Sequence, residues 1–298
     1  MKRAVRQKLF YRRDLISVGF SLFISGLAEI FLNFKKTLII CVPWILLLGG
    51  LTWYVSENPG PVGIALWIAN WLVLPGVAVP WHRHMLLESI DPGRENAGIE
   101  VFFSYLIKWF VMSLILGLLG LLLVFMFGSS AAILMGVPTG IGDAMSQVQA
   151  APFSEENRSI TVALTAAFGL AIFVVVYLAH RLGYILPHVS VSEEPSGYFD
   201  AFMKTAPLSW PLVVVAFLVT IAIVVSIGIA SFPYLLLGAA GFPDMFGPIP
   251  TALVLATYQA LILVLQTLVG ASIQTEIYRI ADGIAEEERA LHVGMRIS

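Results

Sequence analysis

The stretch LSWPLVVVAFLVTIAIVVSIGIA at residues 208–230 indicates the fold class most directly, because it contains no Asp, Glu, Lys, Arg or His. A helix needs about 20 apolar residues to cross a bilayer, and this stretch is long enough. Five further stretches lack the same residue types: 37–54, 61–79, 109–134, 160–178 and 250–272. The sequence therefore predicts an all-α polytopic membrane helix bundle with about six transmembrane helices.

The overall composition supports a membrane protein. Of the 298 residues, 58% are hydrophobic and 12% are charged, whereas a soluble domain has about 25% charged residues. The net charge of −2 argues against a nucleic-acid partner. Cys41 is the single cysteine, which excludes an intrachain disulfide and any C-x-x-C metal or redox motif.

The distribution of basic residues predicts the orientation. Of the 17 Lys and Arg residues, 16 lie before the first span, between the second and third spans, between the fourth and fifth spans, or after the last span. These four regions share one side of the membrane, and Arg158 alone falls on the other side. Because cytoplasmic loops carry an excess of Lys and Arg, both termini are predicted to be cytoplasmic. The chain then divides into a basic segment with an interfacial helix (1–36), a six-helix bundle (37–275) and a charged cytoplasmic tail (276–298).

The segment 15–34, LISVGFSLFISGLAEIFLNF, is long enough to span but shows two faces. Apolar side chains recur at helical spacing, and Ser, Glu and Asn side chains fall on the opposite side. Such segregation with basic flanks favours an amphipathic helix in the interface plane. A seventh span and a signal peptide are the alternatives, although a span would reverse the orientation of everything downstream.

Three similar motifs suggest internal repetition. The second, fourth and sixth spans end in WHRHML, AHRLGYIL and IYRIADGI, whose arginines are Arg83, Arg181 and Arg279. A partly amphipathic stretch precedes the first, third and fifth spans: LAEIFLNFKK, IEVFFSYLIKWF and SGYFDAFMKTAPLSW. We interpret this as three possible hairpin repeats, each with an interfacial lead-in. The alternative is that arginines simply mark the cytoplasmic ends of any six-span protein.

Small and amide side chains predict how the spans pack. Ser113, Gly117, Gly120 and Gly128 form one stripe on the third span, where a neighbouring helix could come close. An unpaired amide facing lipid would cost several kcal/mol. We therefore expect an inward-pointing intramembrane polar face, which fixes packing rather than lining a solute path. Its candidate residues are Asn70, Gln259, Gln266 and Gln274.

The stretch VPWHRHMLLESIDPGR (79–94) raises the question of a metal or haem site. If the helix continues past Pro80, His82 and His84 lie about 200° apart and cannot easily share one ion. A haem between His180 and one of these histidines is the alternative. We favour a basic and aromatic collar at headgroup level, and we expect His188 to be solvated. The candidate headgroup or partner contacts are Trp81, His82, Arg83, His84, His180, Arg181 and Arg279.

No paired carboxylates, G-x-S-x-G elbow or P-loop is present in the sequence. The motifs WHR…LLE, HRL…LP and EIYRIADG, with the amphipathic N-terminal segment, resemble a group of uncharacterised inner-membrane proteins of proteobacteria. This group is distantly similar to the membrane domain of some glycerophosphoryl diester phosphodiesterases. The resemblance implies an architecture and a bacterial inner (cytoplasmic) membrane, but no catalytic residue, because the phosphodiesterase domain has no counterpart here.

Three functions remain as hypotheses. The favoured one is a non-enzymatic accessory, assembly or lipid-interacting module, with membrane lipids and a protein of a membrane complex as partners and no cofactor. The second is an uncoupled small-molecule or lipid transporter or channel, since the predicted spans lack the ionisable residues of coupled pumps. The third is a redox protein that holds haem.

Overall fold

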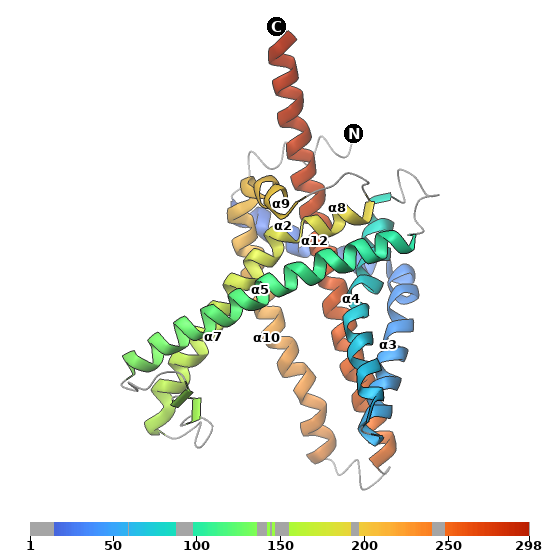
Figure 1. The fold of residues 1–298 in the computed structure, drawn as a ribbon, viewed down its shortest axis with the longest axis vertical. Coiled ribbons are helices and arrows are strands. Elements are labelled where there is room, and N and C mark those ends of the chain that lie inside the picture. The colour runs from blue at the N-terminus through green and yellow to red at the C-terminus, as the bar shows by residue number, and fades with distance from the viewer. Residues whose placement is uncertain are drawn as a thin grey trace. The chain divides into compact units, whose positions relative to one another are not determined.

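The computed structural model describes residues 15–58, 60–87, 98–135, 142–143, 145–146, 155–191, 197–239 and 248–297. All regular elements in these residues are helices (Figure 1). They are α2 (Leu15–Leu32), α3 (Phe34–Glu57), α4 (Val62–Leu87), α5 (Ile99–Leu134), α7 (Glu155–Leu182), α8 (Ile185–Val191), α9 (Tyr198–Lys204), the 3₁₀ helix η2 (Ala206–Leu208), α10 (Ser209–Ala239) and α12 (Pro248–Ile297). In these parts of the chain, seven helical segments are long and apolar enough to cross a membrane. The prediction of an all-α multi-pass membrane protein is confirmed.

Two helices run past the boundaries predicted from the sequence. α4 contains Pro75 and Pro80 and continues without a break to Leu87, so His82 and His84 lie on a helix. α12 likewise continues through residue 276, where the sequence placed the end of the bundle. α3 also begins earlier than predicted, at Phe34 rather than residue 37, so that Asn33 alone separates it from α2. Charged residues near the ends of these apolar stretches are therefore part of the same helices.

The chain forms two compact units. The first contains residues 1–109 and 181–298, and the second contains residues 110–180. In the first unit α12 packs against α2, α3 and α4. Glycines allow close approach there: a Cβ on Gly76 would lie 1.9 Å from the Trp44 ring, and one on Gly49 would lie 3.1 Å from the Cα of Thr257.

The second unit contains most of α5 and α7. Ala132 on α5 forms a buried apolar cluster with Ile160, Leu164 and Phe168 of α7. The predicted small-residue stripe on α5 is only partly a packing face. A Cβ on Gly120 would lie 3.3 Å from Val175, whereas Gly117 is exposed, with no neighbouring atom within 4 Å of its Cβ position.

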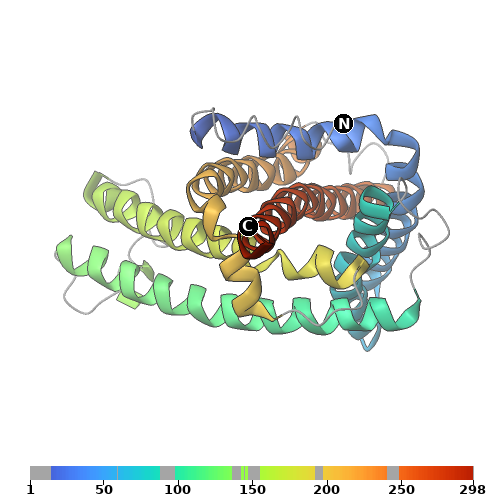
Figure 2. The ribbon, with the colours of Figure 1, turned by 90° about the horizontal axis from the view of Figure 1, so that it is seen from above.

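The helix α2 is the seventh segment that could span by length and composition alone. In the structure it meets two helices in turn: a Cβ on Gly19 would lie 2.7 Å from the Pro211 carbonyl oxygen of α10, and one on Gly26 would lie 2.9 Å from Ile273 of α12. Seven residues of helix extend about 10 Å, which is roughly the distance between packed helices. α2 therefore crosses α10 and α12 rather than running along them, and Figure 2 shows it lengthwise.

The crossing gives α2 three faces instead of the two predicted. Val18, Leu22, Gly26 and Ile30 are buried at every fourth position. The apolar and polar side chains that the sequence segregated are both exposed, in two further rows. The exposed residues of these rows include Ile16, Phe20, Ile24 and Phe31 on the apolar side and Ser17 and Ser21 on the polar side. The sequence pattern missed the third face because two of the contacts that form it involve glycine, which carries no hydrophobic signal.

Candidate functional site

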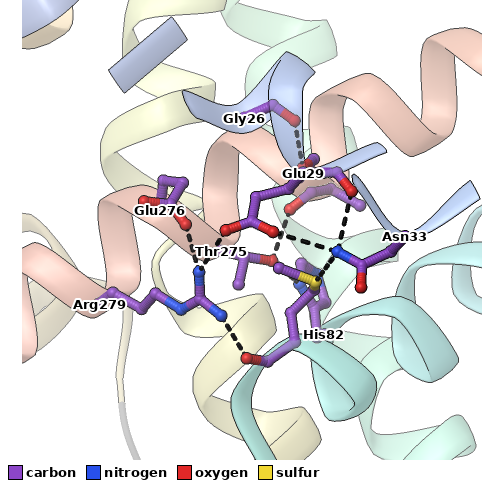
Figure 3. A network of polar contacts seen from close by, with 10 residues as sticks. Gly26, Glu29, Asn33, His82, Thr275, Glu276 and Arg279 are labelled. Carbon is purple, nitrogen blue, oxygen red and sulfur yellow. Dashed lines mark hydrogen bonds and ion pairs between the residues drawn. The ribbon is translucent and has the colours of Figure 1, made fainter. Parts of the chain in front are cut away.

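Arg279 on α12 joins three helices in the first unit (Figure 3). Its guanidinium donates to Glu276 Oε1 on the same helix and to the Met85 carbonyl oxygen of α4. It also lies 3.6 Å from Glu29 Oε1 of α2. Glu276 is only 4% exposed, so its charge needs this partner. We call Glu29, Met85, Glu276 and Arg279 the Arg279 junction.

Further hydrogen bonds attach α2 to the same place. The Asn33 side-chain amide donates to the Glu29 carbonyl oxygen at 2.9 Å and to Glu29 Oε2 at 3.1 Å. Ser272 of α12 donates to the Gly26 carbonyl oxygen at 2.6 Å. Both oxygens of Glu29 therefore have partners, and the side of α2 that faces α12 is fixed by polar contacts as well as by packing.

A chain of buried hydrogen bonds runs beside this junction. His82 Nδ1 lies 2.8 Å from Thr275 Oγ1, and His82 Nε2 lies 3.3 Å from the Tyr105 hydroxyl. Thr275 donates its own proton to the Ala271 carbonyl oxygen, so the hydroxyl accepts from Nδ1–H. Nε2 of a neutral ring then accepts from Tyr105. Because the Ala271 carbonyl oxygen can only accept, it sets the direction of each hydrogen bond in the chain. His82 therefore carries its proton on Nδ1.

Two other arginines hold short helices through backbone carbonyls. Arg83 donates to the Ser190 carbonyl oxygen of α8 at 2.5 Å. Arg181 donates to the Phe202 carbonyl oxygen of α9 at 2.6 Å, and its guanidinium lies 3.6 Å from the centre of the Phe202 ring. A guanidinium has five donors and is more weakly hydrated than an ammonium, which suits it to such buried contacts.

Tyr184 forms another connection in the first unit. Its hydroxyl accepts from Lys204 Nζ at 3.1 Å and donates to Asp282 Oδ1 at 3.3 Å. Its ring lies 5.0 Å from that of Tyr278 and stacks on that of His188. His188 is buried, so the prediction that it is solvated is wrong. His188 lies on α8, which packs against α12. No pattern in the sequence indicated that contact.

These contacts join the three predicted repeats in order. His82 of the first motif meets Tyr105, in the lead-in of the second repeat. Arg181 of the second motif meets Phe202, in the lead-in of the third. Arg279 of the third motif meets Glu29, in the lead-in of the first. All three contacts lie within the first unit and pair the motif of one predicted repeat with the lead-in of another. The duplication itself stays a prediction.

The structure places most of the predicted headgroup contacts inside the protein. Trp81, His82, Arg83, His84, His180 and Arg181 are buried, and only Arg279 is partly exposed. The prediction of a headgroup collar is therefore wrong for the buried residues. The physical reason is that α8, α9 and α2 supply carbonyl and carboxylate oxygens that a single span, viewed in isolation, does not have. His180 Nδ1 instead donates a hydrogen bond within its own helix, to the Val176 carbonyl oxygen at 2.8 Å.

The predicted inward polar face is also corrected. Asn70, Gln259 and Gln266 are exposed, and Gln274 is half-buried. Asn70 donates to the Leu66 carbonyl oxygen of its own helix at 3.0 Å rather than to a glutamine of α12. Gln266 donates to Ser226 of α10 at 2.5 Å. An amide can thus satisfy a donor within its own helix or at a helix edge without pointing into the bundle.

The histidine contacts bear on metal and haem binding. Among the described residues, no three His, Cys, Asp or Glu side chains come together as a metal site would need. Both ring nitrogens of His82 already have hydrogen-bond partners, and an iron ligand would have to give one of them up. The neighbouring acidic residues Glu88 and Asp91 lie outside the described residues.

Sequence reasoning missed the acidic half of the Arg279 junction. Glu29 was assigned to the polar face of an amphipathic helix, and Glu276 was read only as part of a motif. One signal was available: Glu276 precedes Arg279 by three residues, a spacing at which side chains meet on a helix. Nothing local to either segment indicated that Glu29 would join them. No family model, curated protein or solved structure matches the chain.

Proposed function

We propose that the protein is a non-enzymatic accessory or assembly module of a bacterial inner membrane, with both termini in the cytoplasm. The observation that carries the proposal is the exposure of Gln259 and Gln266 within an apolar part of α12. These residues are seven positions apart and so lie on one side of the helix. A polar amide in hydrocarbon favours association, because a neighbouring helix can hydrogen-bond to it.

The polar contacts in the first unit support a structural rather than a chemical role. His82, Arg83 and Arg279 hydrogen-bond to neighbouring helices of the same chain. Contacts of this kind fix the relative positions of α4, α8 and α12 and leave the membrane-facing surface to interact. A bacterial inner membrane follows from the resemblance, and the orientation follows from the distribution of Lys and Arg.

Native mass spectrometry of the protein, extracted gently from its own membrane, tests the proposal. We expect a stoichiometric protein companion that is lost from the Gln266→Leu variant. Leu265→Ala is the matched control, because it changes an exposed neighbour on the same helix and should keep the companion. A wild-type protein that carries no companion, or a companion that Gln266→Leu retains, contradicts the proposed surface.

The hydrogen bond between Gln266 and Ser226 also favours a second candidate function, an uncoupled transporter of small molecules or lipids. In that case the exposed amides line a path beside α10 and α12. A bound small molecule in place of a protein companion supports this function. Flux in proteoliposomes that Gln266→Leu leaves unchanged removes these residues from any such path.

A further inference from the structure

We infer that α2 is a docking surface for anionic phospholipid, with its axis in the plane of the bilayer. The inference rests on the proposed membrane function and deepens it by naming the lipid class and the helix. α2 crosses α10 and α12 through the contacts of Gly19 and Gly26. A helix that runs across two spans lies parallel to the membrane surface when those spans cross the bilayer.

The apolar row of α2 points away from the protein. Phe20 is 48% exposed and Phe31 is 75% exposed, while Ile16 and Ile24 lie on the same side of the helix. The packed residues occupy a different side, at Val18, Leu22 and Ile30. Burial against α10 and α12 therefore does not account for the apolar row, and acyl chains below an interfacial helix would cover it.

The charges around α2 favour an anionic lipid. The only acidic residue of α2 is Glu29, and both its oxygens have partners in the protein. Lys35, the second residue of α3, lies three positions after the end of α2 and is exposed. The sequence before α2 adds basic residues at the other end: Lys2, Arg3, Arg6, Lys8, Arg12 and Arg13. In the sequence, basic residues thus flank the apolar row on both sides, and a negatively charged lipid surface attracts basic flanks of this kind.

A second short helix of the same unit shows similar exposure. On α9, Phe199 is 75% exposed and Met203 is also exposed, although Ala201 between them is buried. Lys204 at the end of α9 bonds to Tyr184 and so is partly used within the protein. α9 thus offers an apolar surface with less basic charge, and the anionic preference is assigned to α2.

Spin labels on α2 test its position in the bilayer. Cys41 is the single cysteine, so Cys41→Ala gives a background for Phe20→Cys and Ser21→Cys. Both positions are exposed, but they lie about 100° apart on the helix. In phosphatidylglycerol-containing vesicles the label at position 20 should be accessible to oxygen, and the label at position 21 to an aqueous nickel complex. Two labels that are both shielded from nickel indicate a span, and two that both react with it indicate a helix in water; either result overturns the inference.

Lipid selectivity is tested by native mass spectrometry of the full chain from bilayers of phosphatidylcholine mixed with phosphatidylglycerol. We expect retained phosphatidylglycerol, reduced about fivefold by Lys35→Gln, the ratio that corresponds to about 1 kcal/mol for one cation near an anionic surface. Arg158→Gln, an exposed cation of α7, is the matched control and should have no effect. Equal retention of both lipids, or equal effects of the two variants, overturns the anionic preference. It leaves the proposed accessory function standing if a protein companion is found.

Discussion

The arginines at the ends of the spans and the amides within the spans differ in burial, and each group differs from what the sequence predicted. The arginines were expected at the surface and the amides inside. Arg83 and Arg181 are buried, although arginines at span ends usually face headgroups. Gln259 and Gln266 are exposed, although membrane amides usually face other helices. The difference lies in the available hydrogen-bond partners. Carbonyl oxygens of α8 and α9 accept from the buried arginines, whereas an amide at the surface can donate to a neighbouring hydroxyl or to a carbonyl oxygen of its own helix.

The comparison implies that the buried charges matter more for stability than the exposed amides. Four substitutions test this contrast: one at a buried charge pair, one at an exposed amide, and two at buried helix contacts, whose effects should lie between these extremes. The four expectations below are given in order of decreasing effect, and all can be measured by unfolding of the purified protein in the same detergent.

Arg279→Gln should have the largest effect, a loss of about 3 kcal/mol in the free energy of unfolding. It removes the guanidinium that neutralises the buried charge of Glu276, and the partial exposure of Arg279 sets the value near the lower end for such pairs. The double variant Glu276→Gln with Arg279→Gln should recover part of the loss. A double variant that is less stable by the sum of the two single losses would contradict the coupling.

Gly26→Ala should cost about 2 kcal/mol, because the added Cβ would lie 2.9 Å from Ile273 Cγ1 and 3.1 Å from the Ile273 backbone. Gly50→Ala is the matched control. Gly50 is also helical, but in the described residues no atom outside its own stretch of helix backbone lies within 4 Å of its Cβ position, so the change should be neutral or slightly stabilising. Equal effects of the two substitutions would show that α2 does not pack tightly on α12.

Tyr105→Phe should cost about 1 to 2 kcal/mol, since it removes the donor to buried His82 Nε2. The ring and its packing stay the same, which isolates the hydroxyl. Tyr54→Phe, at an exposed position, should change stability by less than about 0.5 kcal/mol. The imidazole resonances of His82 provide an independent check, because loss of the Tyr105 bond changes only the Nε2 side of the ring.

Gln266→Leu should have the smallest effect, about 0.6 kcal/mol, the average for hydrogen bonds between membrane helices. It removes the bond to Ser226 but leaves no buried group unpaired. A loss comparable to that of Arg279→Gln would mean that the exposed amides hold the fold together, and the contrast between the two groups would then fail.

Much of the architecture could be predicted because lipid imposes simple rules on a chain. Apolar stretches of sufficient length indicate spans, and the helical spacing of 15–34 indicated a helix with segregated faces. The packed face of α2 could not be predicted, because Gly19 and Gly26 are informative only once Val214 and Ile273 lie opposite them. The site followed the same division: the arginines were recognised as special from their motifs, but their buried positions were not.

The amino-acid sequence alone indicates that the protein is helical, lies in a membrane and carries basic motifs at the ends of alternate spans. These are properties of local composition and period, which one segment shows without its neighbours. Which groups meet became clear from the fold. It joined Ser272 to Gly26, 246 positions away, and brought Arg279 to Glu29. A hydrogen bond depends on distances of about 3 Å between atoms, and helix packing, rather than position in the chain, sets those distances.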